Sequence, residues 1–319
     1  MNPCFIAVDT GGTKIAGAIL DKDGKSYAEE TVFLEGAGGS DVAELLYGLV
    51  RELRKTAVHQ HLKVSAAGVC IPGIAYQKSG RVWAPNIPGW EEYPLREELE
   101  TLLRPAIPVH IDSDRTCSIL AETWLGAAKG CSDAIFVAVG TGIGAGIMSD
   151  GHIIRGHADI AGATGWMALQ PPYDRKFDAC GCFEYYASGN GIVRTAEEFL
   201  ATEKDYKGPL KSGKFKAYDV FMAYDNKDPL AIKTIDKVII FWGMAVANYV
   251  SLFNPEKVIF GGGVFGPAVQ FIPRIVKEAE KWAQPIGIKQ VSVEASQIGP
   301  RAGLLGAGRL AMLSTMKEG

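Results

Sequence analysis

Residues 5–20 read FIAVDTGGTKIAGAIL, in which two apolar, strand-like runs meet at a turn of Asp, Thr and Gly. Adjacent glycines permit positive φ and carry no Cβ, so another group can approach the backbone closely. Successive amide N–H groups in such a turn can converge on an anion. The stretch therefore fits either a phosphate-binding hairpin or an ordinary β-hairpin closed by glycines.

The side chains of this turn suit a nucleotide and its metal ion. Asp9 offers a carboxylate that can hold Mg²⁺ through water, and Thr13 and Lys14 add a hydroxyl and a cation, while Gly11 and Gly12 leave room for phosphates. The spacing of a Walker A loop is absent, and a strand rather than a helix is expected to follow. The functional interpretation is therefore a hairpin, not a P-loop, that binds phosphate and Mg²⁺, and an ordinary β-hairpin remains the alternative.

Composition and charge exclude several classes of protein. The chain has 319 residues, 47% hydrophobic and 22% charged, with a net charge of −3, which allows two domains with substantial cores. The charge argues against nucleic acid or a membrane surface as partner, and no apolar run approaches the roughly 20 residues that span a bilayer. A strand is expected from about residue 4, without a signal peptide. Six scattered cysteines suit reduced thiols in a cytoplasmic protein.

Apolar periodicity divides the chain into two α/β halves. The first reads as three strands followed by helix, strand, helix and strand, and the second repeats the opening strand–turn–strand pattern. We predict domains at 1–115, joined by the C-terminal helix at about 302–319, and at 116–301, with a ligand cleft between them. Helices are expected at 42–58, 94–103, 116–128, 182–200, 218–224, 229–253, 271–283 and 302–312, with the small residues 188–191 within or interrupting the helix at 182–200. Further strands are expected at 25–34, 64–71, 80–84, 109–111, 134–139, 145–149, 257–260 and 291–295.

Two further glycine clusters are candidates for nucleotide binding. The turn 140–146 resembles the first one and contributes Thr141, Gly142 and Gly144; a pair of such turns could clamp opposite sides of a polyphosphate. At the end of a later strand, Gly262 and Gly263 would let a flat base lie against the backbone. The alternative for this last cluster is an ordinary strand-to-helix turn.

Asp114 is the candidate catalytic base. It follows a strand and opens a helix in the run IDSDR, residues 111–115. Phosphoryl transfer to a hydroxyl needs a carboxylate positioned to accept the hydroxyl proton. The alternative for Asp114 is a helix N-cap, the commonest role of Asp at such a place. Asp112, two residues earlier, is a competing carboxylate.

With these motifs in view, the chain resembles the ROK family (repressors, open reading frames, kinases), whose sugar kinases have the actin-like, ribonuclease-H-like ATPase fold. The resemblance runs nearly from end to end. It rests on DTGGTK at 9–14, GVCIPG at 68–73, APNIPGW at 84–90, Ser113-Asp114, GTGIGAG at 140–146, Glu184 with Ser188-Gly189, and FNP at 253–255 before the glycines at 261–263.

The family implies ATP, Mg²⁺, a sugar or sugar-like acceptor and a homodimer or homotetramer. By match of motif, the first turn and Thr141-Gly142 would hold phosphates and magnesium, and Gly262-Gly263 would lie near adenine. Asp114 would be the base. The resemblance places on the acceptor side Gly73, Asn86, Ser113, Asp114, Trp166 and Glu184.

The chain departs from the family pattern at the acceptor site. Ser113 stands where kinases of the family usually carry Asn, and Ala163 and Trp166 stand where the family has a sugar-binding Glu and a zinc-ligating His. A buried hydroxyl without its partner costs about 1–3 kcal/mol, so a standard hexose should bind poorly. Arg115 replaces a small residue and would be either a salt-bridged surface residue or a group that recognises an anionic substituent. Trp166 would either stack on the acceptor or fill the core.

The cysteine cluster of the family is also reduced here, to Cys180 and Cys182. A structural zinc normally has four protein ligands, so no structural zinc is expected, although His157 could substitute for the missing ligand. The loop 170–179 would then replace the metal by packing.

Two functions remain open at this point: a carbohydrate kinase with an altered acceptor, and a ligand sensor that has the fold without turnover. Asp9, Thr141 and Asp114 favour the kinase, because a sensor needs no base. A DNA-binding repressor is not expected, since only a few residues precede the first hairpin.

Overall fold

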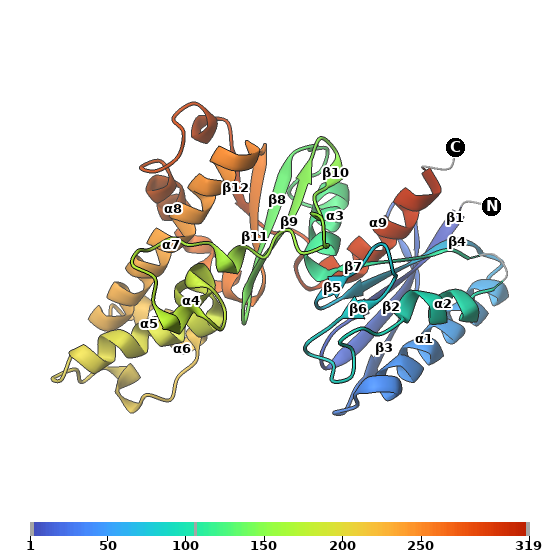
Figure 1. Ribbon diagram of the computed structural model, residues 1–319, viewed down its shortest axis with the longest axis horizontal. Coiled ribbons are helices and arrows are strands. Elements are labelled where there is room, and N and C mark those ends of the chain that lie inside the picture. Colours follow the sequence, from blue (N-terminus) through green and yellow to red (C-terminus); the bar gives the residue numbers. More distant parts are fainter. Residues whose placement is uncertain (1–2, 105–106, 317–319) are drawn as a thin grey trace. The chain divides into compact units, whose positions relative to one another are not determined.

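The computed structural model describes residues 3–104 and 107–316. It contains two compact units (Figure 1). The first comprises Met1–Lys129, Arg155–Ile160 and Pro300–Gly319, and the second comprises Gly130–Ile154 and Ala161–Gly299. Of the predicted C-terminal helix at 302–319, the last three residues lie outside the described part of the chain.

The first unit is built on a mixed sheet with strand order β3-β2-β1-β4-β7. The predicted hairpin is present: β1 and β2 are antiparallel, with Asp9 opposite Ala16 and Thr10 opposite Ile15. β4 and β7 run parallel to β1 on its other side. The strands are β1 (Pro3–Thr10), β2 (Lys14–Asp21), β3 (Ser26–Phe33), β4 (Lys63–Ile71) and β7 (Val109–Ser113).

Helices cover both faces of this sheet (Figure 1). α1 (Gly39–His59) and α2 (Leu95–Leu102) pack on one face, where alternate strand residues such as Ile6 and Val8 meet the apolar side of α1. α3 (Asp114–Leu125) and α9 (Ala302–Met316) cover the other face, which includes Phe5 and Ala66. A two-stranded ribbon, β5 (Ile74–Ala75) and β6 (Val82–Trp83), completes the unit.

The C-terminal helix α9 lies close to its neighbours because small residues face them. A Cβ on Gly306 would overlap the carbonyl of Cys117 on α3, and one on Gly68 of β4 would overlap the carbonyl of Ala307. α3 is therefore part of the first unit, which extends to Lys129 and beyond the boundary predicted at residue 115.

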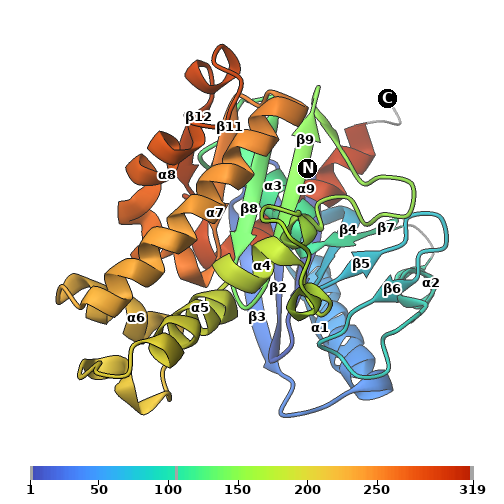
Figure 2. The same cartoon turned by 60° about the vertical axis from the view of Figure 1, so that its left-hand side comes forward.

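The sheet of the second unit repeats the first topology, with strand order β10-β9-β8-β11-β12, of which β9, β8, β11 and β12 are labelled in Figure 2. An antiparallel hairpin of β8 and β9 again begins the unit, and β11 and β12 run parallel to β8. This agrees with two related α/β halves. The strands are β8 (Ala134–Val139), β9 (Ile143–Ser149), β10 (His152–Ile153), β11 (Lys257–Gly261) and β12 (Ser292–Ala295).

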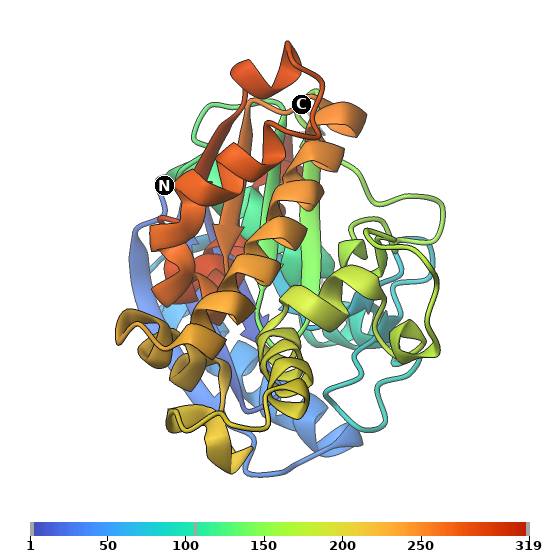
Figure 3. The same cartoon turned by 90° about the vertical axis from the view of Figure 1, so that its left-hand side faces the viewer.

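The core of the second unit lies between this sheet and a layer of helices, of which α7 is the longest (Figure 3). The helix predicted at 182–200 is two helices, because the Ser188 side chain caps the second one by accepting from Gly191 N–H at 3.0 Å. The helices are α4 (Cys182–Ala187), α5 (Gly189–Thr202), α6 (Ala217–Asp225), α7 (Pro229–Phe253) and α8 (Ile272–Ala279). Short 3-10 turns lie at Thr164–Trp166, Arg175–Phe177, Pro209–Ser212, Gly263–Phe265, Pro267–Phe271, Gly287–Lys289 and Gly299–Arg301. Within the described residues, none of the helices has the length and apolarity that a membrane crossing requires.

Candidate active site

The first glycine turn lies between β1 and β2 beside the loop that carries Asn86. The turn is closed by the N–H of Gly11, which donates to the carbonyl of Lys14 at 2.9 Å. A Cβ on Gly12 would lie 3.4 Å from the Cβ of Asn86, so backbone and amide side chain are neighbours. The Asn86 loop is anchored by buried Trp90, whose indole donates to Gly39 O at 3.0 Å. The first unit thus brings a predicted phosphate turn and a predicted acceptor residue together.

Asp9 lies in a narrow space at the end of β1. Its strand neighbour in register is Cys70, whose register partner on β7 is Asp112. Burial raises the pKa of Asp9, while a hydrogen bond from the Cys70 thiol and the charge of Lys14 partly oppose that shift. A Cβ on Gly303, in the first turn of α9, would overlap the Asp9 carboxylate.

Gly303 is therefore a site residue that the sequence reasoning missed. The available signal was the group of glycines at 303, 306 and 308 within one helix, since glycine in a helix interior is unfavourable unless close packing requires it.

Asp112 is not free to compete with Asp114. One of its oxygens accepts from both Nε and Nη2 of Arg155, at 2.8 and 2.6 Å, and the other accepts from the N–H of Ser113 at 2.8 Å. The side chain is only 5% exposed. Its charge and lone pairs are thus engaged by a buried ion pair, which gives Asp112 a structural role. Arg155 was not singled out from the sequence.

Asp114 is not the N-cap of α3, contrary to the alternative raised from the sequence. Ser113 is the N-cap, and its hydroxyl accepts from Thr116 N–H at 3.2 Å and contacts Thr116 Oγ1 at 3.1 Å. Asp114 is the first helical residue and is solvent-accessible, with one oxygen accepting from Arg115 N–H at 2.8 Å. Within residues 3–104 and 107–316, no salt bridge engages the Asp114 carboxylate.

The pKa of Asp114 lies above the ordinary value of an aspartate. The main cause is the surrounding protein atoms, which reduce the hydration of the carboxylate although the residue remains exposed, and the negative charge of Asp9 adds to the shift. The Arg115 charge and its backbone N–H partly oppose it. A carboxylate that is accessible, does not serve as a helix cap and has a raised pKa is suited to accept a proton. The hydroxyl of Ser113 is engaged in capping the helix, and the residue is only 6% exposed. A direct contact of this hydroxyl with an acceptor is therefore not favoured.

In the second unit, Glu184 supports the second glycine turn. Its Oε2 accepts from the N–H of Ile143 at 2.7 Å, and a Cβ on Gly142 would lie 2.6 Å from that oxygen. Position 142 therefore requires glycine, because a larger residue would collide with the Glu184 carboxylate. Burial raises the pKa of Glu184, with the Ile143 N–H and the charge of Arg194 opposing. Gly144 lies within β9, opposite Ala138.

The three glycine motifs of the second unit line one pocket of about 680 Å³. Gly140 and Thr141 come from the turn, Gly189 and Asn190 from the start of α5, and Gly263 from the start of the 3-10 turn that follows β11. The N–H of Gly189 donates to the carbonyl of Gly140 at 2.7 Å and joins two of these motifs. The segment between α5 and α6 also contributes to the lining, through Phe215 and Lys216.

The glycines of this pocket have different roles. A Cβ built on Gly140 or Gly263 would meet nothing within 4 Å, so ligand atoms could approach the backbone there. Gly262 instead has a φ of +87° and a Cβ there would overlap Val139 O, which makes it a structural glycine. Gly73, in the first unit, is also structural, because a Cβ would overlap the carbonyl of Trp83.

Trp166 is exposed by 58%, so the alternative that it fills the core is wrong. Buried Phe177 anchors the loop 170–179. Its ring packs edge-on against Tyr185 and Tyr186, at centroid distances of 5.4 and 5.7 Å. Tyr173, in the same loop, is 73% exposed.

The cysteines of this region have other neighbours. Cys180 Sγ accepts from Arg194 Nη1 at 3.3 Å, and Cys182 is buried. His157 belongs to the first unit, whereas both cysteines belong to the second. Over the described ranges, no group of three or more His, Cys, Asp or Glu is arranged to hold a metal ion.

Comparisons with known proteins agree with this architecture. The model of the ROK family matches residues 5–313. The chain is 30% identical over 315 residues to the glucokinase of Halalkalibacterium halodurans, covering 96% of this chain and 94% of that protein. The ROK hexokinase of Thermus thermophilus has 28% identity and a TM-score of 0.81, with 99% of this chain and 100% of that chain covered.

A second solved relative is the ROK glucokinase of Streptomyces griseus, determined in complex with glucose and AMPPNP. It is 29% identical with a TM-score of 0.75, and 97% of this chain and 99% of that chain are covered. The two mixed sheets, with their repeated strand order, have the actin-like fold of the ROK hexokinase. From its sequence, its topology and these matches, the chain is a member of the ROK family.

Proposed function

We propose that the protein transfers the terminal phosphoryl group of ATP to a hydroxyl of a sugar or sugar-like acceptor, with Asp114 as general base. The family includes kinases of this type, such as the glucokinases to which the chain is similar. The finer assignment, to an acceptor other than a standard hexose, rests on this chain's own residues.

The observation that carries the proposal is the division of roles between Asp112 and Asp114. Arg155 neutralises Asp112, and Ser113 provides the helix cap. Asp114 is left accessible with a raised pKa. Such a carboxylate can accept the acceptor's hydroxyl proton, a role worth about 10²–10⁴-fold in rate.

The residues of both glycine turns fit a nucleotide. Thr141 and the open backbone at Gly140 and Gly263 line a pocket of suitable size. In the first unit, Lys14 and Thr13 are exposed beside the turn. A single half-buried carboxylate suits Mg²⁺, which usually keeps several waters, so Asp9 would hold it through water. The ion would neutralise phosphate charge.

On the acceptor side, we propose Asn86 and Glu184 as the groups that bind hydroxyls. Asn86 is exposed beside Gly12. Glu184 uses one oxygen for Ile143 N–H and has the other available. Ser113 would act indirectly, by starting α3 at the position that presents Asp114. Arg115 remains a candidate for an anionic substituent.

The test is ADP release over a panel of sugars, amino sugars and cyclitols. Turnover on at least one acceptor is expected, and Asp114→Asn should lower it by at least about 10²-fold while ATP binding persists. Asp41→Asn is a matched control, because Asp41 is also an exposed aspartate in the first turn of a helix of the same unit. Unchanged turnover in Asp114→Asn would refute the role of the base.

The second candidate is a ligand sensor without turnover, favoured by Ala163 and Trp166 at positions where the family pattern has polar groups. Tight binding of an acceptor with no ADP release from any member of the panel would select it. Metal analysis of the purified protein tests the expectation that zinc is absent. The homodimer or homotetramer and the cytoplasmic location remain predictions, and light scattering tests the first.

A further inference from the structure

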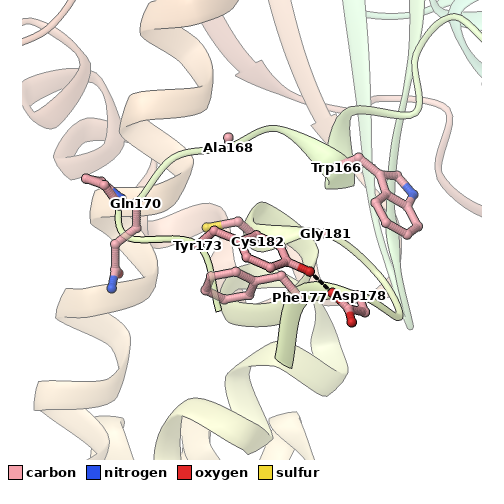
Figure 4. Close-up of a pocket in the computed structure, with 9 residues that line it drawn as sticks. Trp166, Ala168, Gln170, Tyr173, Phe177, Asp178, Gly181 and Cys182 are labelled. Atoms are coloured by element: carbon pink, nitrogen blue, oxygen red, sulfur yellow. Dashed lines mark hydrogen bonds between the residues drawn. The ribbon is translucent and has the colours of Figure 1, made fainter. Parts of the chain in front are cut away.

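A second pocket of the second unit, of about 550 Å³, is lined mainly by aromatic and apolar groups (Figure 4). Its residues come from the loop after the second hairpin and from the start of α4. Phe177 and Cys182 are buried, whereas Trp166 and Tyr173 are 58% and 73% exposed. The lining further includes Ala168 and Pro171.

The charged side chain in this lining, Asp178, already has a hydrogen-bond partner. The Tyr173 hydroxyl donates to Asp178, as the dashed line in Figure 4 shows. Apart from the amide of Gln170, the pocket therefore offers a ligand mainly apolar surface. Two exposed aromatic rings line this apolar pocket. A ligand that covered them would remove apolar surface from water, which favours binding.

The pocket adjoins the proposed acceptor site through backbone contacts. A Cβ on Gly165 would lie 2.9 Å from the Cβ of Glu184, and a Cβ on Gly181 would overlap the backbone of Trp166. Trp166 thus directly follows a residue packed on Glu184 and itself lines the pocket. A group attached to an acceptor held by Glu184 would need to extend only past Trp166 to reach it.

We infer that the acceptor carries an apolar, ring-bearing substituent, and that this pocket binds it. The inference rests on the proposed function, because it takes Glu184 to bind the acceptor's hydroxyls. The sugar ring would bind at Glu184, and its substituent would lie against Trp166 and Tyr173. A volume of about 550 Å³ accommodates a phenyl ring with its linkage.

The test compares pairs of acceptors that differ only in methyl against phenyl. The pairs are the α- and β-glucosides at C1 and the N-acetyl and N-benzoyl amides of glucosamine at C2. For at least one pair, the phenyl compound should have a kcat/KM at least about tenfold higher, since one methylene in an apolar pocket already discriminates by 10–200-fold. Calorimetric binding of the same pairs supplies a readout that needs no turnover.

Substitutions in the lining test whether a preference for the phenyl compounds depends on this pocket. Trp166→Ala and Tyr173→Ala should bring the phenyl-to-methyl ratio close to one, while Tyr173→Phe, which retains the ring, should preserve it. Trp282→Ala is the control, because Trp282 is 61% exposed and lies outside the pocket; it should not change the ratio.

The failure of this inference differs from the failure of the kinase proposal. No preference for phenyl in any pair, by rate or by binding, overturns the inference, as does a preference that survives both alanine substitutions. Preferential binding without ADP release from any acceptor supports the pocket and overturns the kinase.

Discussion

Asp112 and Asp114 are two residues apart but lie in different electrostatic environments. Arg155 pairs with Asp112, whereas Asp114 has Asp9 as a charged neighbour and is partly withdrawn from water. A desolvated carboxylate beside a like charge accepts a proton more readily. Asp112 is therefore engaged in an ion pair, and Asp114 is available for chemistry.

The raised pKa of Asp114 predicts the acid limb of the pH profile. The base must be deprotonated, so kcat/KM should fall as the pH drops through the pKa of Asp114, at a pH above the 3.8 of an ordinary aspartate. The profile is measured for the preferred acceptor at several Mg²⁺ concentrations. Asp9 also has a raised pKa, and an inflection that moves with Mg²⁺ would belong to Asp9. A limb at or below 3.8 would contradict the prediction.

Gly303→Ala should disturb Asp9 without unfolding the protein. The added methyl would overlap the Asp9 carboxylate, so the carboxylate must move, and displacement of a catalytic group by about 1 Å can cost 10²-fold in rate. We expect turnover to fall by about that factor and the Mg²⁺ requirement to rise. Circular dichroism checks that the fold persists. Full activity with an unchanged Mg²⁺ titration would be evidence against a role of Asp9 in holding magnesium.

At the scale of the elements, α9 is defined by close packing rather than by an apolar stripe. Its glycines let the helix backbone approach α3 and the sheet of the first unit, which larger residues would prevent. The intrinsic weakness of glycine in a helix is offset by burial of Ala307, Ala311 and Met312. The same approach brings the first turn of α9 against Asp9.

Gly306→Ala should therefore lower stability, although alanine is the better helix former. The methyl would overlap the carbonyl of Cys117, and such overpacking costs about 1–3 kcal/mol. Gly48→Ala in α1 is the matched control, since a Cβ there meets nothing within 4 Å and should stabilise by about 0.5–1 kcal/mol. Urea unfolding measures both; equal stability of the two variants would contradict the packing argument.

At the scale of the whole molecule, the chain passes between its two units four times, after residues 129, 154, 160 and 299. The short segment Arg155–Ile160 returns to the first unit and is fixed there by two contacts. Arg155 pairs with Asp112, and Asp159 accepts from the N–H of Gln77 at 3.0 Å. Tethers of this kind couple the unfolding of the connecting segment to that of the first unit.

Arg155→Met should lower stability by several kcal/mol, because it leaves the Asp112 carboxylate, 5% exposed, without its cation; breaking such pairs costs about 3–5 kcal/mol. Asp112→Asn combined with Arg155→Met should recover part of the loss, since no uncompensated charge remains. Thermal unfolding of the two single variants and the double variant gives the coupling. Purely additive effects would show that the pair does not hold the segment.

Much of the fold could be predicted because it follows from local patterns. Apolar, strand-like runs that meet at glycine turns indicated the hairpins, and 3.6-residue periodicity indicated α1 and α7. The predicted bounds of α7, 229–253, agree with the observed helix. Repetition of the opening pattern also indicated the two related sheets.

The remaining features depend on residues that are distant in sequence. Arg155 lies 43 positions from Asp112, and Glu184 lies 41 positions from Ile143. Which carboxylate is neutralised, which glycine lies against a side chain and whether Trp166 is exposed follow from these contacts, because burial and charge pairing belong to the folded arrangement and not to a local run of residues. The sequence by itself therefore determined the secondary elements, their order and the family, whereas the tertiary structure decided that Ser113 caps α3, that Asp114 is available, and that Trp166 lines a pocket.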